Sequence, residues 1–132
     1  MLNQKTFSIL IQKFLQEEFP EFLPSVNYLP DNSFDCSLKS LSESFSIWIA
    51  TYNSEITIGI EDPNGNSDIH THISFHEMED LEDSLNTLSK MIREIIGNEI
   101  IVYQNQDGKY GWATESEFLK TECSKIFYWD KN

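Results

Sequence analysis

The sequence has few basic residues and few cysteines. Nine Lys and Arg stand against 22 Asp and Glu in 132 residues, which gives a formal net charge of −13. A chain this acidic repels phosphate backbones and anionic headgroups, so neither nucleic acid nor a membrane surface is expected as a partner. Cys36 and Cys123 have no CxxC or CxxH neighbours, which argues against a disulfide framework or a zinc knuckle. We expect both to be reduced, mostly buried thiols.

Long hydrophobic runs are also missing. Near the N-terminus the longest run, Ile9 to Ile11, is followed by Gln12 and Lys13, and no small-residue cleavage site comes after it. No segment approaches the length of a bilayer-spanning helix. We therefore expect a cytoplasmic protein. Hydrophobic residues at 39% and aromatics at 13% suffice for one folded domain over residues 1–132.

The hydrophobic periodicity predicts a helix, a group of strands and a second helix. Apolar residues at i, i+3 and i+4 mark amphipathic helices over about 4–19 and 79–96. Between them, four segments alternate apolar and polar residues and have short connections, which predicts an antiparallel meander. The alternating segments are Phe34–Leu38, Phe45–Thr51, Ile56–Ile60 and Ile69–Phe75.

After residue 97 the pattern predicts a hairpin, a short helix and a last strand. Asp107-Gly108 is a strong turn dipeptide between residues 100–103 and 110–113. Thr114-Glu-Ser-Glu117 has the form of a capping box, and residues 126–129 are a candidate strand. The predicted fold is α+β: an antiparallel sheet of about six strands with the N-terminal and central helices packed on one face. The predicted order is α-β-β-β-β-α-β-β-(short α)-β.

The negative charge is concentrated in the middle of the chain. No Lys or Arg lies between Lys39 and Lys90, whereas ten Asp and Glu do. The negative electrostatic potential around this segment steers a basic partner toward it and raises the association rate. The apolar residues of each strand must face the helices, so the alternate residues point to the other, open face of the sheet. These outward residues include Trp48, Tyr52, Glu55, Glu61, Asp68, His70 and His72.

Aromatic rings among charged neighbours are typical of protein-binding hot spots. Gly59, on the central strand, leaves a gap that a neighbouring ring or a partner could fill. The alternative is that Trp48 and Tyr52 are covered, either by the connection over residues 20–33 or by the aromatic residues 127–129.

All three histidines fall in the segment DIHTHISFHE, residues 68–77. His70 and His72 have the i, i+2 spacing of ligand pairs on strands. With Gly65 and Glu77 they nearly match the first cupin motif, but the spacing from Gly65 is one residue short, Ser84 replaces the closing glycine and no second motif follows. We interpret His70 and His72 as exposed strand residues, with a metal-dependent enzyme as the alternative. Because no nucleophile or phosphate-loop motif is present, no catalytic residue, metal or cofactor is predicted.

The run from Trp48 to Tyr52, then 55–61, a turn, and 68–73 before an acidic helix resembles small bacterial immunity proteins. These are antidotes encoded beside polymorphic or contact-dependent toxins. The resemblance covers about residues 45–96. It implies a cytosolic inhibitor without catalytic activity that blocks a cognate toxin domain, often a basic nuclease. Under this hypothesis Trp48 and Tyr52 are apolar anchors, Glu55, Glu61, Asp62 and Asp68 pair with toxin Lys or Arg, and His70 and His72 add hydrogen bonds.

A second family shares part of this pattern. Class I type III secretion chaperones are also small acidic α+β proteins, and they bind extended effector segments as dimers. The strand-rich middle of this chain fits them less well. The sequence leaves open whether the protein is a monomer or a homodimer.

Overall fold

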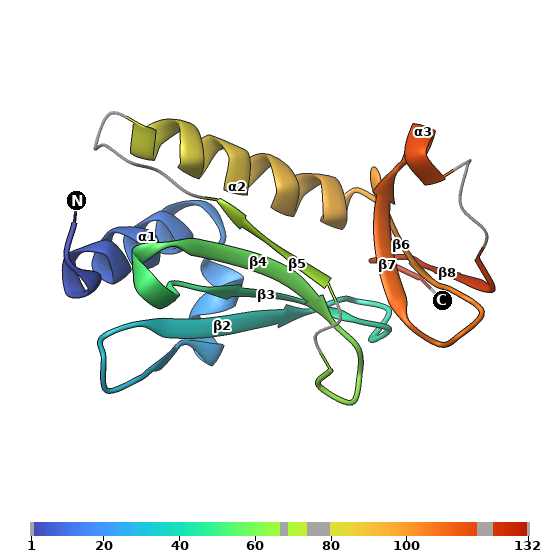
Figure 1. Ribbon diagram of the computed structural model, residues 1–132, viewed down its shortest axis with the longest axis horizontal. Helices are drawn as coiled ribbons and strands as arrows, with labels where there is room; N and C mark the ends of the chain where they lie inside the picture. The colour runs from blue at the N-terminus through green and yellow to red at the C-terminus, as the bar shows by residue number, and fades with distance from the viewer. Residues whose placement is uncertain (1, 67–68, 74–79, 119–122, 132) are drawn as a thin grey trace.

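Two antiparallel sheets and two long helices form the described part of the chain (Figure 1). The computed structural model describes residues 2–66, 69–73, 80–118 and 123–131. The α+β class predicted from the sequence is confirmed, and the predicted elements follow one another in the predicted order, with one short strand, Asn27–Tyr28, in addition. The helices are α1 (Gln4–Glu18), η1 (Pro20–Ser25), η2 (Tyr52–Ser54), α2 (Leu81–Ile96) and α3 (Glu115–Phe118). The strands are β1 (Asn27–Tyr28), β2 (Phe34–Lys39), β3 (Ser46–Ala50), β4 (Ile56–Glu61), β5 (Ile69–Ile73), β6 (Ile100–Gln104), β7 (Tyr110–Thr114) and β8 (Lys125–Phe127).

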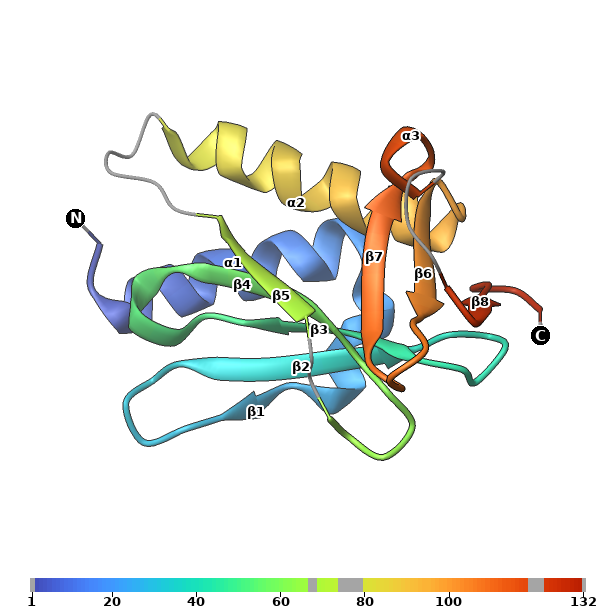
Figure 2. The ribbon, with the colours of Figure 1, turned by 45° about the vertical axis from the view of Figure 1, so that its right-hand side comes forward.

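The two long helices lie on the same side of the first sheet (Figure 2). Helix α1 begins at Asn3, whose side chain accepts a hydrogen bond from the Thr6 N–H at 2.8 Å and so caps the helix. Pro20 follows its last turn and starts η1. The buried stripes of α1 and α2 pack onto the isoleucines of β3 and β4, which are almost fully excluded from solvent. This burial fixes which face of the sheet stays open.

The first sheet has the order β1-β2-β3-β4-β5, with every neighbouring pair antiparallel. The predicted four-strand meander is therefore confirmed. The short strand β1 adds a fifth member from a segment that the sequence predicts as a turn-rich connection. The predicted strand end at Phe75 and helix start at Glu79 lie outside the described residues.

The second sheet has the order β7-β6-β8 and stands at the C-terminal end of α2 (Figure 1). The described residues thus hold eight strands in two sheets, where the sequence predicts about six in one. The alternation of apolar and polar residues identifies a strand but does not say which strand it pairs with. Strand β6 follows α2, which has carried the chain past the end of the first sheet, so β6 pairs in a second sheet. The two sheets share one apolar cluster, because Val102, Phe127 and Trp129 join the core. Trp129 packs edge-on against Phe45 at 5.7 Å between ring centroids.

The bond from the Thr114 N–H to the Glu117 carboxylate, one half of the predicted capping box, is present before α3. The Glu117 carboxylate accepts hydrogen bonds from the Thr114 N–H at 3.3 Å and from the Thr114 hydroxyl at 2.9 Å. This contact holds the start of a four-residue helix.

Candidate functional site

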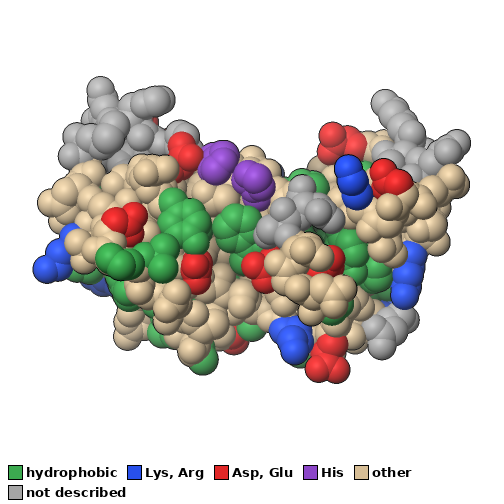
Figure 3. Space-filling model, turned by 60° about the horizontal axis from the view of Figure 1, so that its bottom comes forward, with side chains coloured by type: hydrophobic (Ala, Val, Ile, Leu, Met, Phe, Trp, Pro, Cys, Tyr) green, Lys and Arg blue, Asp and Glu red, His purple; other side chains and the backbone are tan. Residues whose placement is uncertain are grey.

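We use the name open face for the side chains of β2–β5 that point away from α1 and α2. The strand registers place these side chains in rows across the sheet. Figure 3 shows the two described histidines beside hydrophobic side chains, with carboxylates around them. The first row is Ser37, Trp48, Gly59 and His70, and the second is Asp35, Ala50, Thr57 and His72.

The Trp48 ring lies over Gly59. A Cβ atom at Gly59 would come 2.6 Å from Trp48 Nε1, 2.6 Å from the Ile69 carbonyl oxygen and 2.8 Å from His70 Cβ. Only glycine leaves room for this arrangement, so the predicted gap is filled by a ring of the chain itself. The indole N–H is buried and has no hydrogen-bond partner among the described residues. The half-buried Trp48 ring also lines a cavity.

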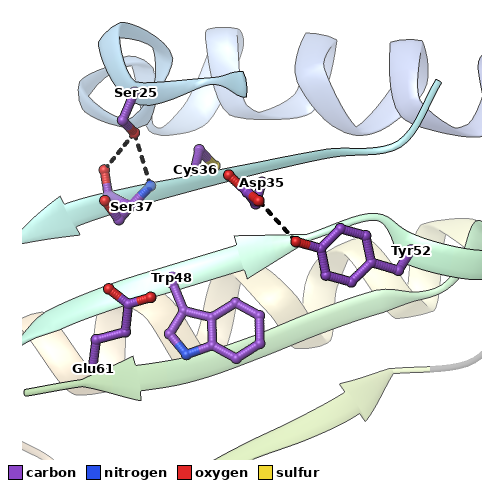
Figure 4. A pocket seen from close by; sticks show the side chains of 7 residues that line it. All are labelled: Ser25, Asp35, Cys36, Ser37, Trp48, Tyr52 and Glu61. Atoms are coloured by element: carbon purple, nitrogen blue, oxygen red, sulfur yellow. Dashed lines mark hydrogen bonds between the residues drawn. The ribbon is translucent and has the colours of Figure 1, made fainter. Parts of the chain in front are cut away.

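This cavity, which we call the Trp48 pocket, has a volume of about 320 Å³. It is open to solvent and spans β2, β3 and β4 below η1 (Figure 4). The Tyr52 hydroxyl donates to Asp35 Oδ2 at 2.7 Å and holds that carboxylate in place. The pocket is lined by Ser25, Asp35, Cys36, Ser37, Trp48, Tyr52 and Glu61.

Negative charge dominates the electrostatics of the pocket. Partial burial, followed by the charges of Asp35 and Asp62, raises the pKa of Glu61. Burial, followed by the hydrogen bond to Asp35, raises the pKa of Tyr52 to about 12. Burial and then the Asp35 charge raise the pKa of the Cys36 thiol to about 12, so Cys36 is protonated and unreactive at neutral pH. No lysine or arginine of the described residues forms an ion pair with Asp35 or Glu61.

The described histidines lie beside the pocket. His72 Nδ1 is 2.9 Å from Glu55 Oε1 and 2.9 Å from Thr57 Oγ1. The rings of His70 and His72 meet edge to face, with centroids 5.1 Å apart, and the Trp48 ring is 6.0 Å from that of His70. In the part of the chain that the structure describes, no three His, Cys, Asp or Glu side chains gather as metal ligands. The cupin-like Glu77 lies outside the described residues.

The structure brings together most of the side chains that the sequence predicts for this surface. Trp48, Tyr52 and Glu61 line the pocket, and His70 and His72 lie next to it with Glu55. Asp62 instead holds the turn after β4, where its Oδ1 accepts from the Asn64 N–H at 2.8 Å and the Asn66 N–H at 3.0 Å. Asp68 lies outside the described residues.

Asp35, Ser37 and Ser25 also belong to the site, although the sequence prediction did not include them. Asp35 and Ser37 alternate with the buried Phe34 and Cys36, so the period of two in β2 already carried that signal. Ser25 reaches the site from η1, where its Oγ contacts both the carbonyl oxygen and the N–H of Ser37 at 2.8 Å. No sequence pattern links these two segments.

The alternative, in which other segments cover Trp48 and Tyr52, is not what the described residues show. The connection after α1 contributes only Ser25 to the lining of the pocket. Trp129 is buried in the core against Phe45, away from the open face. Tyr52 is 36% exposed and Trp48 is half-buried.

Among the described helices, none combines the length and the apolar character that a membrane crossing requires. Comparison with protein-family models, with curated proteins and with solved structures found no match. The function is therefore inferred from the geometry and charge of the open face.

Proposed function

We propose that this protein is a cytoplasmic immunity protein that neutralises a cognate basic toxin domain by binding it through the open face. The observation that supports this proposal is the Trp48 pocket, where two aromatic rings lie beside carboxylates that have no cationic partner in the described residues. Trp and Tyr in a partly desolvated hollow are typical hot-spot residues. Carboxylates around them select a basic partner and disfavour an acidic one.

The distribution of charge supports the same proposal. The ion pair between Arg93 and Glu18 lies on the helices, which cover the opposite side of the sheet. Lys39 stands at the end of β2 and forms no ion pair with Glu61 among the described residues. Among the described residues Lys39 is the one Lys or Arg in β2–β5, in the same register row as Ser46 and Glu61, so the open face keeps a net negative charge that raises the rate of encounter with a basic protein.

Co-expression tests the proposal. The C-terminal domain encoded by the adjacent gene is expressed alone and together with this protein. We expect growth arrest with the domain alone, normal growth with both, and a stable complex after purification. Unaffected growth in both cases and no complex would contradict the proposal.

Two variants test whether the open face is the surface that binds the toxin domain. Trp48→Ala removes a ring from the open face, and we expect it to abolish or weaken the protection. Leu41→Ala is the matched control, because Leu41 is 75% exposed in the turn between β2 and β3 and does not line the pocket. Equal loss of protection in both variants would show that the open face is not the binding surface.

A further inference from the structure

The walls of the Trp48 pocket offer hydrogen-bond acceptors and ring faces, but few donors. The Tyr52 hydroxyl already donates its hydrogen bond to Asp35. The Ser25 hydroxyl lies 2.8 Å from the Ser37 carbonyl oxygen, and the Ser37 N–H is bonded to Ser25 Oγ in return. The Trp48 N–H is buried against Gly59 rather than exposed to the cavity. The Ser37 hydroxyl is a remaining donor among the lining side chains, but a carboxylate or a phosphate bound there would also meet two carboxylates.

The two carboxylates are held apart on different strands. Asp35 comes from β2 and is fixed by Tyr52, whereas Glu61 comes from the end of β4 and lies beside the Trp48 ring (Figure 4). Partial burial is the main cost of ionising Glu61, and the negative charge of Asp35 adds to it, so the pKa of Glu61 is raised. A cation between these groups would relieve the repulsion and complete the hydrogen bonds of both carboxylates.

We propose that the Trp48 pocket receives the guanidinium group of one arginine side chain from the protein partner. That the arginine belongs to a toxin partner rests on the function proposed above. That the pocket binds a guanidinium group rests on the pocket alone. A guanidinium is flat, so it stacks on the indole face of Trp48 while its edges donate to Asp35 and Glu61. It is also more weakly hydrated than an ammonium group, which suits a partly desolvated site beside an aromatic ring. A lysine would supply charge without the stacking surface or the fork of donors.

A small probe tests the pocket without any partner. The full-length protein, labelled with nitrogen-15, is titrated with Nα-acetyl-arginine methylamide while the indole N–H resonance of Trp48 is followed. The Trp48→Phe variant assigns that resonance. Nα-acetyl-citrulline methylamide is the matched control because its neutral ureido group has the same shape. We expect a saturable shift of the Trp48 resonance and of the Gly59 amide with the arginine probe only.

Variants that each replace one carboxylate by a neutral amide show where the arginine probe binds. We expect Glu61→Gln and Asp35→Asn each to weaken binding of the arginine probe about tenfold, since each removes a charge-assisted hydrogen bond. Glu17→Gln makes the same change in net charge on the exposed side of α1, and it should leave the affinity unchanged. A dispersed spectrum for every variant shows that the fold is intact.

Three results would overturn the inference. The first is a Trp48 shift no larger with the arginine probe than with citrulline. The second is an equal loss of affinity in Glu17→Gln and Glu61→Gln, which would reduce the effect to net charge. The third is equal binding of Nα-acetyl-lysine methylamide, which would refute selection of a guanidinium. Failure of the co-expression test with a positive probe titration would instead refute the proposed function and leave the pocket as a guanidinium site.

Discussion

The substitution Gly59→Ala adds one methyl group at the point where the Trp48 ring crosses the sheet. The new Cβ would lie 2.6 Å from Trp48 Nε1 and 2.6 Å from the Ile69 carbonyl oxygen. The indole can rotate away, but the carbonyl belongs to the backbone of β5 and moves only if β4 and β5 separate locally. Overpacking of this kind costs about 1–3 kcal/mol. For a chain of this size that corresponds to a fall in Tm of roughly 3–12 °C.

Thermal unfolding followed by circular dichroism measures this cost, and the Trp48 indole resonance reports the position of the ring. We expect a lower Tm and a displaced resonance in Gly59→Ala. Gly97→Ala is the control, since Gly97 has φ −84° and its Cβ would contact only the Arg93 carbonyl oxygen at 3.1 Å. A Tm unchanged from wild type in Gly59→Ala, with the Trp48 resonance in place, would show that the ring does not lie over Gly59.

The remaining predictions concern the open face. Trp48→Ala should cost about 2 kcal/mol or more of partner binding by calorimetry with the fold retained, and unfolding of the variant would mark Trp48 as core. Because the pKa of Glu61 is raised in the folded state, its ionisation opposes folding, and this cost grows as pH rises through the folded pKa. Glu61→Gln should therefore be more stable than wild type to urea at neutral pH, with the gain vanishing at acidic pH; a pH-independent difference would refute this assignment. The association rate with a basic partner should fall as ionic strength rises, and a flat profile would exclude steering. Protein purified without added metal should retain partner binding in EDTA, whereas stoichiometric metal in the purified protein would favour an enzyme centred on His70 and His72.

Local periodicity predicted most of the fold. The alternation around Ile47 and Ile58 and the helical stripe of α2 follow from side-chain geometry alone, so strands, helices and the buried face could be predicted. The division into two sheets could not. Pairing of β6 with β8 joins Val102 to Phe127 across a connection whose path is set by tertiary packing. Strand β1 was also missed, because two residues are too few to show a period.

The candidate site was predicted in part for the same reason. Trp48 could be placed on the open face because it alternates with the buried Ile47 and Ile49, and Gly59 stood out as a residue without a side chain beside it. Tyr52 lies in η2, beyond the end of β3, where strand alternation no longer determines which way a side chain points. The bond from Tyr52 to Asp35 joins residues that are not adjacent in any local pattern. The contribution of Ser25 depends on how η1 packs over β2, which is a property of the folded chain.

The segment around residues 125–129 ties the two sheets together and has a consequence for the order of synthesis. The Ser42 N–H donates to the Trp129 carbonyl oxygen at 2.8 Å, and Trp129 covers Phe45 in the core. These contacts join residues more than 80 positions apart, so they form only after nearly the whole described chain has left the ribosome. The meander β2–β5 has local pairings and can assemble earlier. During translation the apolar edge at Phe45 therefore stays uncovered until Trp129 arrives to close it.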